Sequence, residues 1–240
     1  MSDFLGFRPA AQRFFRSLGR HNTRDWFEAN RALYEHEVRE PMRSLVEELD
    51  VRLATQAPEL MGDPRHSVFR IHRDIRFSKD KSPYKTNAGC WFYHRNAGRA
   101  VGQDAEGGGA GFYFHLDGSS SFVAGGIWMP PRGALNRIRD AIAEAPATVP
   151  ALLLEPRFKR RFGALSREAM LTRVPRGYPP DHPAADLLRF QSFTVSRELS
   201  AKEIGTPRLV DRLARDFEVM LPLVRWLNRA LGHLPADSRL

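Results

Sequence analysis

Cysteine is nearly absent from this sequence, and so are the features of a secreted or membrane protein. The one cysteine, Cys90, has no second cysteine with which to form an intramolecular disulfide, and no cysteine and histidine residues share the spacing of a zinc site. No run of about 18 apolar residues occurs, and the N-terminus lacks the apolar core of a signal peptide. We therefore expect a cytoplasmic protein that does not associate with a membrane.

Lysine is scarce as well. Five of the 37 basic residues are lysines, and the 28 acidic residues leave a formal net charge of +9 at pH 7. A basic balance of this kind favours anionic partners. Residues 65–99 hold nine arginines and lysines but two aspartates, so most of the net charge lies there, and Lys79, Lys81 and Lys85 lie close together within it. The concentration indicates a localised anion site more than a broad basic surface.

The hydropathy pattern divides the chain into three parts. Apolar residues recur at helical spacing over residues 8–57 and again, mainly, over residues 133–232. Over residues 67–130 they alternate with the period of two that is typical of strands. The strands predicted from this alternation, with one more among the C-terminal helices, are Val68–Phe77, Cys90–Arg95, Gly111–Leu116, Phe122–Met129 and Gln191–Arg197.

These patterns predict one α+β domain over residues 1–240. The short connections between the predicted strands favour an antiparallel sheet of about four to six strands, packed with N-terminal and C-terminal helices. The Gly-rich segment 96–110 is expected to be a mobile loop, either a lid or merely disordered.

Two helix starts carry capping signals. Asn22 or Thr23 is expected to cap a helix near the N-terminus, because both side chains can accept a hydrogen bond from the first turn. Thr206 is expected to cap the final helix, with Pro207 at its first position.

The basic segment RIHRDIRFSKDKSPYKT, residues 70–86, is the most informative stretch. A strand would place Arg70, His72, Asp74 and Arg76 on one face and Arg73 on the other, so a bulge or bend is needed to bring all of them to one site. Arginine can donate two hydrogen bonds at once to a phosphate or carboxylate, and lysine adds a compact positive charge, so the mixture of the two favours binding of such a group. The ligand contacts predicted for an anionic small molecule, such as a nucleotide or phosphate ester, are Arg70, Arg73, Arg76, Lys79, Lys81, Tyr84 and Lys85.

Several roles follow from residue type alone. Asp74 would orient an arginine, Tyr84 would stack on the ligand or hydrogen-bond to it, and Asp74, His72 and Tyr84 are the acid/base candidates if a reaction occurs. Gly125 and Gly126 either relieve a bulge or let a ligand or a neighbouring backbone approach closely. If the sheet places them beside the basic strand, they would form the floor of the pocket. Neither a nucleophile elbow, a phosphate-binding loop nor a zinc-protease motif occurs, so whether the protein is an enzyme stays open.

Metal and cofactor binding are not expected. His72, His94 and His115 lie on different predicted strands, and histidines in such positions are more often hydrogen-bonded structural residues than metal ligands. No cofactor motif occurs.

Other interpretations of the basic segment stay open. Its charges can form internal ion pairs, with Asp74 pairing Arg76 or Arg70 and Asp80 pairing a lysine. It can bind nucleic acid, with aromatic residues such as Trp91, Tyr93 or Tyr113 stacking on bases. It can also be a non-catalytic structural or interaction feature without a small ligand.

The same segment resembles a known family. RDIRFSKDKSPYK is similar to the hallmark of the bacterial and fungal proteins grouped as domain of unknown function 2461. The stretches that extend the resemblance over nearly all of the chain are NTRDWFEANRALYE, GFYFHLDGSSSFVAGGIWMPP and PRGYPPDHPAADLLRFQSF. The resemblance implies an α+β domain and implies no reaction. The residues that match the hallmark are Arg73, Asp74, Arg76, Phe77, Ser78, Asp80, Lys81, Pro83, Tyr84 and Lys85.

Overall fold

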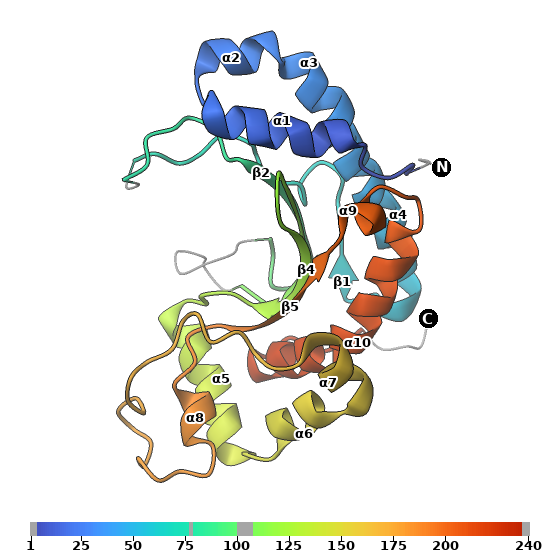
Figure 1. Cartoon of the computed structure of the whole chain (residues 1–240). Coiled ribbons are helices and arrows are strands. Elements are labelled where there is room, and N and C mark those ends of the chain that lie inside the picture. Colours follow the sequence, from blue (N-terminus) through green and yellow to red (C-terminus); the bar gives the residue numbers. More distant parts are fainter. Residues whose placement is uncertain (1–3, 77–78, 100–107, 237–240) are drawn as a thin grey trace.

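An antiparallel sheet of five strands organises the computed structural model, which describes residues 4–76, 79–99 and 108–236. The strands lie side by side in chain order, and each pairs with the next one along the chain (Figure 1). They are β1 (Leu60–Met61), β2 (Asn87–His94), β3 (Gly111–Asp117), β4 (Ser121–Ile127) and β5 (Phe193–Leu199). The predicted α+β class and antiparallel sheet are confirmed.

Helices from both ends of the chain pack around this sheet. The N-terminal helices lie at one end of the molecule, and the helices around α7 lie at the other (Figure 1). The N-terminal group comprises α1 (Pro9–Arg20), α2 (Arg24–Ala29), α3 (Arg31–Tyr34), the π-helix η1 (Glu35–Arg39) and α4 (Glu40–Gln56). The C-terminal group comprises α5 (Arg132–Glu144), α6 (Thr148–Leu154), α7 (Pro156–Phe162), α8 (Ala185–Leu188), α9 (Ala201–Ile204) and α10 (Leu209–Ala230).

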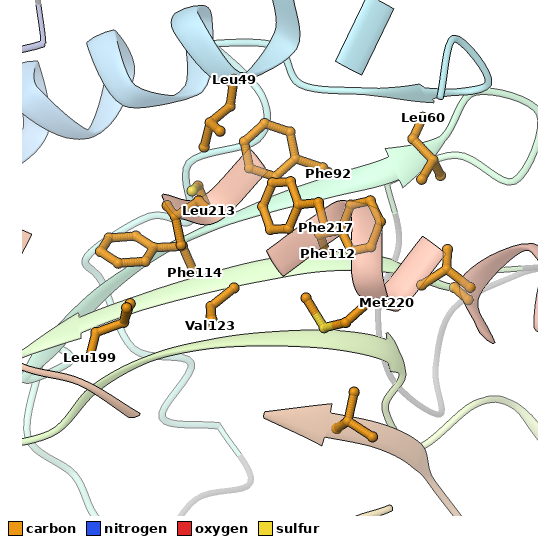
Figure 2. Packing of buried hydrophobic residues seen from close by; sticks show 14 of the residues in the cluster. Leu49, Leu60, Phe92, Phe112, Phe114, Val123, Leu199, Leu213, Phe217 and Met220 are labelled. Carbon is orange, nitrogen blue, oxygen red and sulfur yellow. The ribbon is translucent and has the colours of Figure 1, made fainter. Parts of the chain in front are cut away.

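The hydrophobic core lies between one face of the sheet and α10. Alternation in β2 and β3 directs Phe92 and Phe112 to this face, and the ring of Phe112 stacks on Phe217 of α10 at a centroid distance of 4.3 Å. Figure 2 shows Phe92, Phe112 and Phe217 together, with Leu49 of α4 on the far side. Burial of such large side chains contributes about 1.5–3 kcal/mol each relative to exposure, so this interface fixes the position of α10 on the sheet.

Gly125 and Gly126 of β4 permit close packing. A Cβ atom on Gly125 would lie 2.6 Å from the sulfur of Met220, so this glycine faces α10. Gly126 has φ +123°, and a Cβ atom there would lie 1.9 Å from the carbonyl oxygen of Phe193 in β5. Both glycines therefore admit a neighbouring group of the protein itself, which is one of the explanations that strand glycines allow.

The predicted strand Val68–Phe77 is wrong in extent. Residues 68–76 form no strand and make two isolated bridges, Val68 with Cys90 and His72 with Tyr84. Only the start of the segment meets β2, where the backbone N–H of Phe69 donates to the carbonyl of Gly89. Further along, Ile71 and Arg73 bond to residues 83–85 of the same hairpin, which are not a strand. We call the irregular hairpin formed by residues 67–76 and 79–86 the basic arm; in Figure 1 it projects from β2 beside the N-terminal helices.

Other boundaries shift by a few residues. The final helix begins at Leu209 and not at Pro207, and its N-cap, Arg208, makes no side-chain capping bond. Thr23 caps α2 as predicted, accepting a hydrogen bond from the backbone of Trp26. Phe77 and Ser78 of the family hallmark and residues 100–107 of the Gly-rich loop lie outside the described residues.

No helix in the described part of the chain combines the length and the apolar character needed to cross a bilayer.

Candidate anion site on the basic arm

The basic arm is fastened to the N-terminal helices through Tyr84. The side-chain amide of Asn22 donates to the carbonyl of Tyr84 (2.9 Å) and accepts from its backbone N–H (3.1 Å). The Tyr84 ring stacks on Phe27 of α2 at 4.1 Å, and the residue is 2% exposed. Because its ring is buried, Tyr84 offers no surface on which a ligand can stack, and its role in the structure is to anchor the arm.

Asp74 and Arg76 neutralise each other on the exposed side of the arm. The guanidinium donates from Nε (3.0 Å) and from a terminal nitrogen (2.7 Å) to the two carboxylate oxygens of Asp74. This pairing is the first cause of a pKa for Asp74 that is far below its usual range. A carboxylate with a strongly lowered pKa is a weak general base near neutral pH, so the geometry does not favour Asp74 as a proton acceptor.

A second set of internal contacts closes the tip of the arm. Asp80 forms an ion pair with Arg73 (2.5 Å), whereas the internal-pairing interpretation predicted that it would pair with a lysine. Asp80 also accepts a hydrogen bond from the backbone N–H of Ser82 (2.9 Å), and Lys81 donates to the carbonyl of Ile75 (2.8 Å). Asp80 and Lys81 therefore shape the turn. The Nε atom of Arg73 is buried and has no hydrogen-bond partner among the described residues.

Lys85 is the cation that the arm itself does not neutralise. Its ammonium lies 5.5 Å from the centre of the Phe69 ring, and no described carboxylate forms an ion pair with it. Burial lowers the pKa of Lys85, and the positive charges of Arg70 and Arg73 lower it further. Three cations of the predicted site thus act on one another; the charge of Arg70 also acts on Asp74, whereas Lys85 forms no ion pair with an acidic residue of the described chain.

Beside Lys85 lies the face of the sheet that points away from α10, which we call the outer face. Phe69 of the arm packs edge-on against Tyr113 at 6.1 Å, and Phe122 of β4 stacks on His115 at 4.5 Å. Tyr113 lies over Gly89 of β2, where a Cβ atom would be 2.4 Å from its hydroxyl oxygen. An aromatic surface therefore adjoins the cations.

The outer face also carries a short series of polar contacts. The hydroxyl of Tyr113 lies 3.0 Å from Nδ1 of His115, and Nε2 of His115 lies 3.6 Å from a carboxylate oxygen of Asp117. Burial lowers the pKa of His115 and raises that of Tyr113, while the Asp117 charge opposes the shift of His115. His115 is therefore held mainly neutral near pH 7, with Tyr113 protonated beside it.

The structure brings together some of the predicted site residues and separates others. Arg70, Arg73 and Lys85 lie near one another, whereas Lys79 is exposed near the tip of the arm. Gly125 and Gly126 belong to β4, which β3 separates from β2 and the arm, so they do not form a floor for this site. His72 acts on Glu28 of α2 through its charge, and its ring lies 5.1 Å from that of Tyr84.

Metal-binding residues do not meet within the described chain. His94 is buried, and its ring stacks at 5.2 Å on that of His233, which is not one of the three predicted strand histidines. Among the described residues no group of three or more histidine, cysteine, aspartate or glutamate side chains is placed to hold a metal ion.

Phe69, Tyr113 and His115 adjoin the cations although they were not included among the predicted ligand contacts. The alternation in β3 places Tyr113 and His115 on one face, but pairing of that face with the arm requires the register of β2. The signal available in the sequence was Gly89, because a glycine within a strand indicates that another group approaches closely, and here that group is the Tyr113 ring.

Comparison with known proteins supplies the family and no activity. The family model described as "Conserved hypothetical protein (DUF2461)" matches residues 10–226. No curated protein and no solved structure gives a significant match. The matched segment includes the whole basic arm and every strand of the sheet. The chain therefore belongs to the DUF2461 family of conserved hypothetical proteins.

Proposed function

We propose that the protein binds a small anionic ligand, a phosphate ester or a carboxylate, between the basic arm and the outer face of the sheet. The observation that carries the proposal is Lys85, which is partly buried, lies near Arg70 and Arg73, and has no acidic partner in the described chain. Like charges in such an arrangement repel one another, and an anion placed among them reverses the sign of the interaction. No reaction is proposed.

The surroundings of Lys85 favour an organic anion. The guanidinium of Arg70 can hold two oxygens of a phosphate or carboxylate at once, while the lysine ammonium supplies a compact charge. Phe69 is partly exposed next to Tyr113, and their rings offer an apolar surface to the remainder of the ligand. A nucleotide or a phosphorylated metabolite combines both features.

Thermal unfolding and calorimetry with defined anions test the proposal. Adenosine monophosphate, citrate and inorganic phosphate, each at equal ionic strength, are compared on the wild type, on the Arg70→Gln/Lys85→Gln variant and on the control variant Arg173→Gln/Lys202→Gln. We expect at least one of the organic anions to raise the unfolding temperature of the wild type and the control, and binding by the arm variant to weaken about tenfold or more. The arm variant should still fold, because the change removes like-charge repulsion.

Two outcomes would overturn the proposal. One is the absence of a response to all three anions, and the other is undiminished binding by the arm variant. The salt dependence separates a small ligand from nucleic acid, since an oligonucleotide that contacts several phosphates loses affinity steeply as salt rises. Binding of a single-stranded oligonucleotide with that steep dependence, and of none of the small anions, would replace the small-ligand proposal by the nucleic-acid alternative.

A further inference from the structure

A second group of basic side chains lines a groove that the charge pattern of the sequence did not reveal. The groove has a volume of about 420 Å³ and lies between α7 and α10. Its lining residues are Arg157, Arg160, Arg161, Arg212, Arg215 and Val219. In Figure 1, α7 lies at the opposite end of the molecule from α2 and the basic arm.

Helical spacing explains why the arginines converge. Residues three or four apart lie on the same face of a helix, and Arg157, Arg160 and Arg161 have that spacing on α7. On α10, Arg212 and Arg215 are three apart, and Val219 follows one turn later. The two basic faces form the two walls of the groove.

Three of the five arginines are engaged by acidic residues. Arg161 donates to Asp216 (2.5 Å), which is fully buried and also receives Arg197 of β5. Arg157 approaches Glu218 at 3.4 Å, and Arg212 approaches Glu203 at 3.6 Å. Since Asp216 and Glu203 are both shared with Arg197, these acids do not neutralise the groove.

The remaining two arginines lie on opposite walls of the groove, and the charge of Arg160 also acts on Glu155 in the turn before α7. Arg160 on α7 and Arg215 on α10 are exposed, and neither makes a hydrogen bond or ion pair within residues 4–76, 79–99 and 108–236. Each carries five N–H donors in a planar fork that matches phosphate oxygens. One free guanidinium on each wall is the arrangement that grips an anion from two sides.

We propose that this groove binds a compact anion that carries two or more phosphate groups, with Arg160 and Arg215 as the principal contacts. Its volume is within the range of small-molecule sites. Separate walls with one free arginine each suit separate phosphate groups, so a diphosphate or triphosphate should bind more tightly than a single phosphate. The site is independent of the one proposed on the basic arm.

Calorimetric titration with inorganic tripolyphosphate tests this inference. Tripolyphosphate and orthophosphate are titrated at equal ionic strength into the wild type and the Arg160→Gln/Arg215→Gln variant. The matched control is Arg173→Gln/Arg176→Gln, which removes two exposed arginines that make no hydrogen bond or ion pair within the described chain. We expect the wild type and the control to bind tripolyphosphate more tightly than orthophosphate, and the groove variant to bind it about tenfold or more weakly. The groove variant should fold normally, because neither substituted residue has a hydrogen bond or ion pair within the described chain to lose.

The Arg70→Gln/Lys85→Gln variant separates this site from the arm. Tripolyphosphate binding that survives the arm substitutions and is lost with the groove substitutions supports the inference. If the groove variant binds as the wild type does, or if the arm variant loses the binding, the inference is overturned. A poly-glutamate peptide that binds the groove while tripolyphosphate does not would also overturn it, in favour of an acidic protein partner.

Discussion

At the scale of single residues, Gly126 shows how tightly adjacent strands approach each other. The Gly126→Ala change should lower the free energy of unfolding by roughly 2–4 kcal/mol, because it combines a strained φ with a clash against the Phe193 carbonyl. The measurement is urea denaturation of the purified variant. Gly133 in α5 is the control, since a Cβ atom there meets nothing within 4 Å.

The control substitution has its own expected sign. Gly133→Ala should leave stability unchanged or raise it by up to about 1 kcal/mol, because alanine is a better helix former than glycine. Equal effects of Ala at both positions would contradict the close approach described for β4 and β5.

The roles of individual side chains in the candidate site were the hardest feature to predict from the sequence. The capping role of Thr23 depends on the next few residues and was predictable. The role of Tyr84 depends on Asn22 and Phe27, which are remote in sequence, so its residue type suggested a ligand contact where the structure has an anchor. Asp80 likewise forms its ion pair with Arg73 and not with a nearby lysine, because the bend of the arm brings the Arg73 guanidinium close to the Asp80 carboxylate.

At the scale of elements, Asp216 joins α10 to β5 and α7. It is fully buried and pairs with Arg197 (2.7 Å) and Arg161 (2.5 Å). The Asp216→Asn change should cost about 3–5 kcal/mol of unfolding free energy, because it leaves Arg197 without its buried counter-charge. Chemical denaturation measures the loss.

Asp211 provides a comparison on the same helix. It pairs with Arg52 at 2.9 Å, but about half of each side chain is exposed. Asp211→Asn should therefore cost no more than about 1 kcal/mol. A similar cost for both substitutions would show that burial does not distinguish the two ion pairs.

Element boundaries were predictable where hydrophobic periodicity and packing agree. Strand β3 was expected over Gly111–Leu116 and extends by one residue. The prediction was correct because its alternating apolar residues, Phe112, Phe114 and Leu116, are all buried in the core. The period of two in residues 68–77 is equally regular, yet those residues mostly lack a neighbouring strand. Periodicity alone does not show whether a partner exists.

At the scale of the whole molecule, two partly buried histidines give stability a predictable pH dependence. Burial lowers the pKa of His115 and of His233, and the neighbouring His94 lowers the latter further. Between these lowered values and the ordinary value of 6.5, the unfolded chain binds more protons than the folded protein. Their contribution is therefore complete above about pH 6.5 and is lost as the pH falls through the lowered values.

Denaturant titrations between about pH 7.5 and 5.5 measure this dependence. The wild type should become less stable as the pH falls, and the His115→Gln/His233→Gln variant should show a smaller decrease. His21 is exposed and forms no ion pair with a described acidic residue, so His21→Gln serves as the control. An unchanged slope in the double variant would show that other groups carry the acid sensitivity.

The charge pattern of the sequence indicates one of the two proposed anion sites more plainly than the other. Residues 65–99 hold the excess charge and include the basic arm. The α7 arginines belong to a short basic run, residues 157–161, but Arg212 and Arg215 of α10 lie among Asp211, Asp216 and Glu218, so no local excess marks that wall of the groove. Their convergence depends on the packing of α7 beside α10, which only the tertiary structure shows.

The position of α10 over the sheet also determines when the fold can close during synthesis. The core face of β2, β3 and β4 is covered by a helix that begins at Leu209, well after β4 ends at Ile127. At ~5–20 residues per second, the ribosome takes on the order of ten seconds to make the intervening chain. During that interval Phe92 and Phe112 lack their partner Phe217, so the nascent chain exposes an apolar sheet face that chaperones recognise.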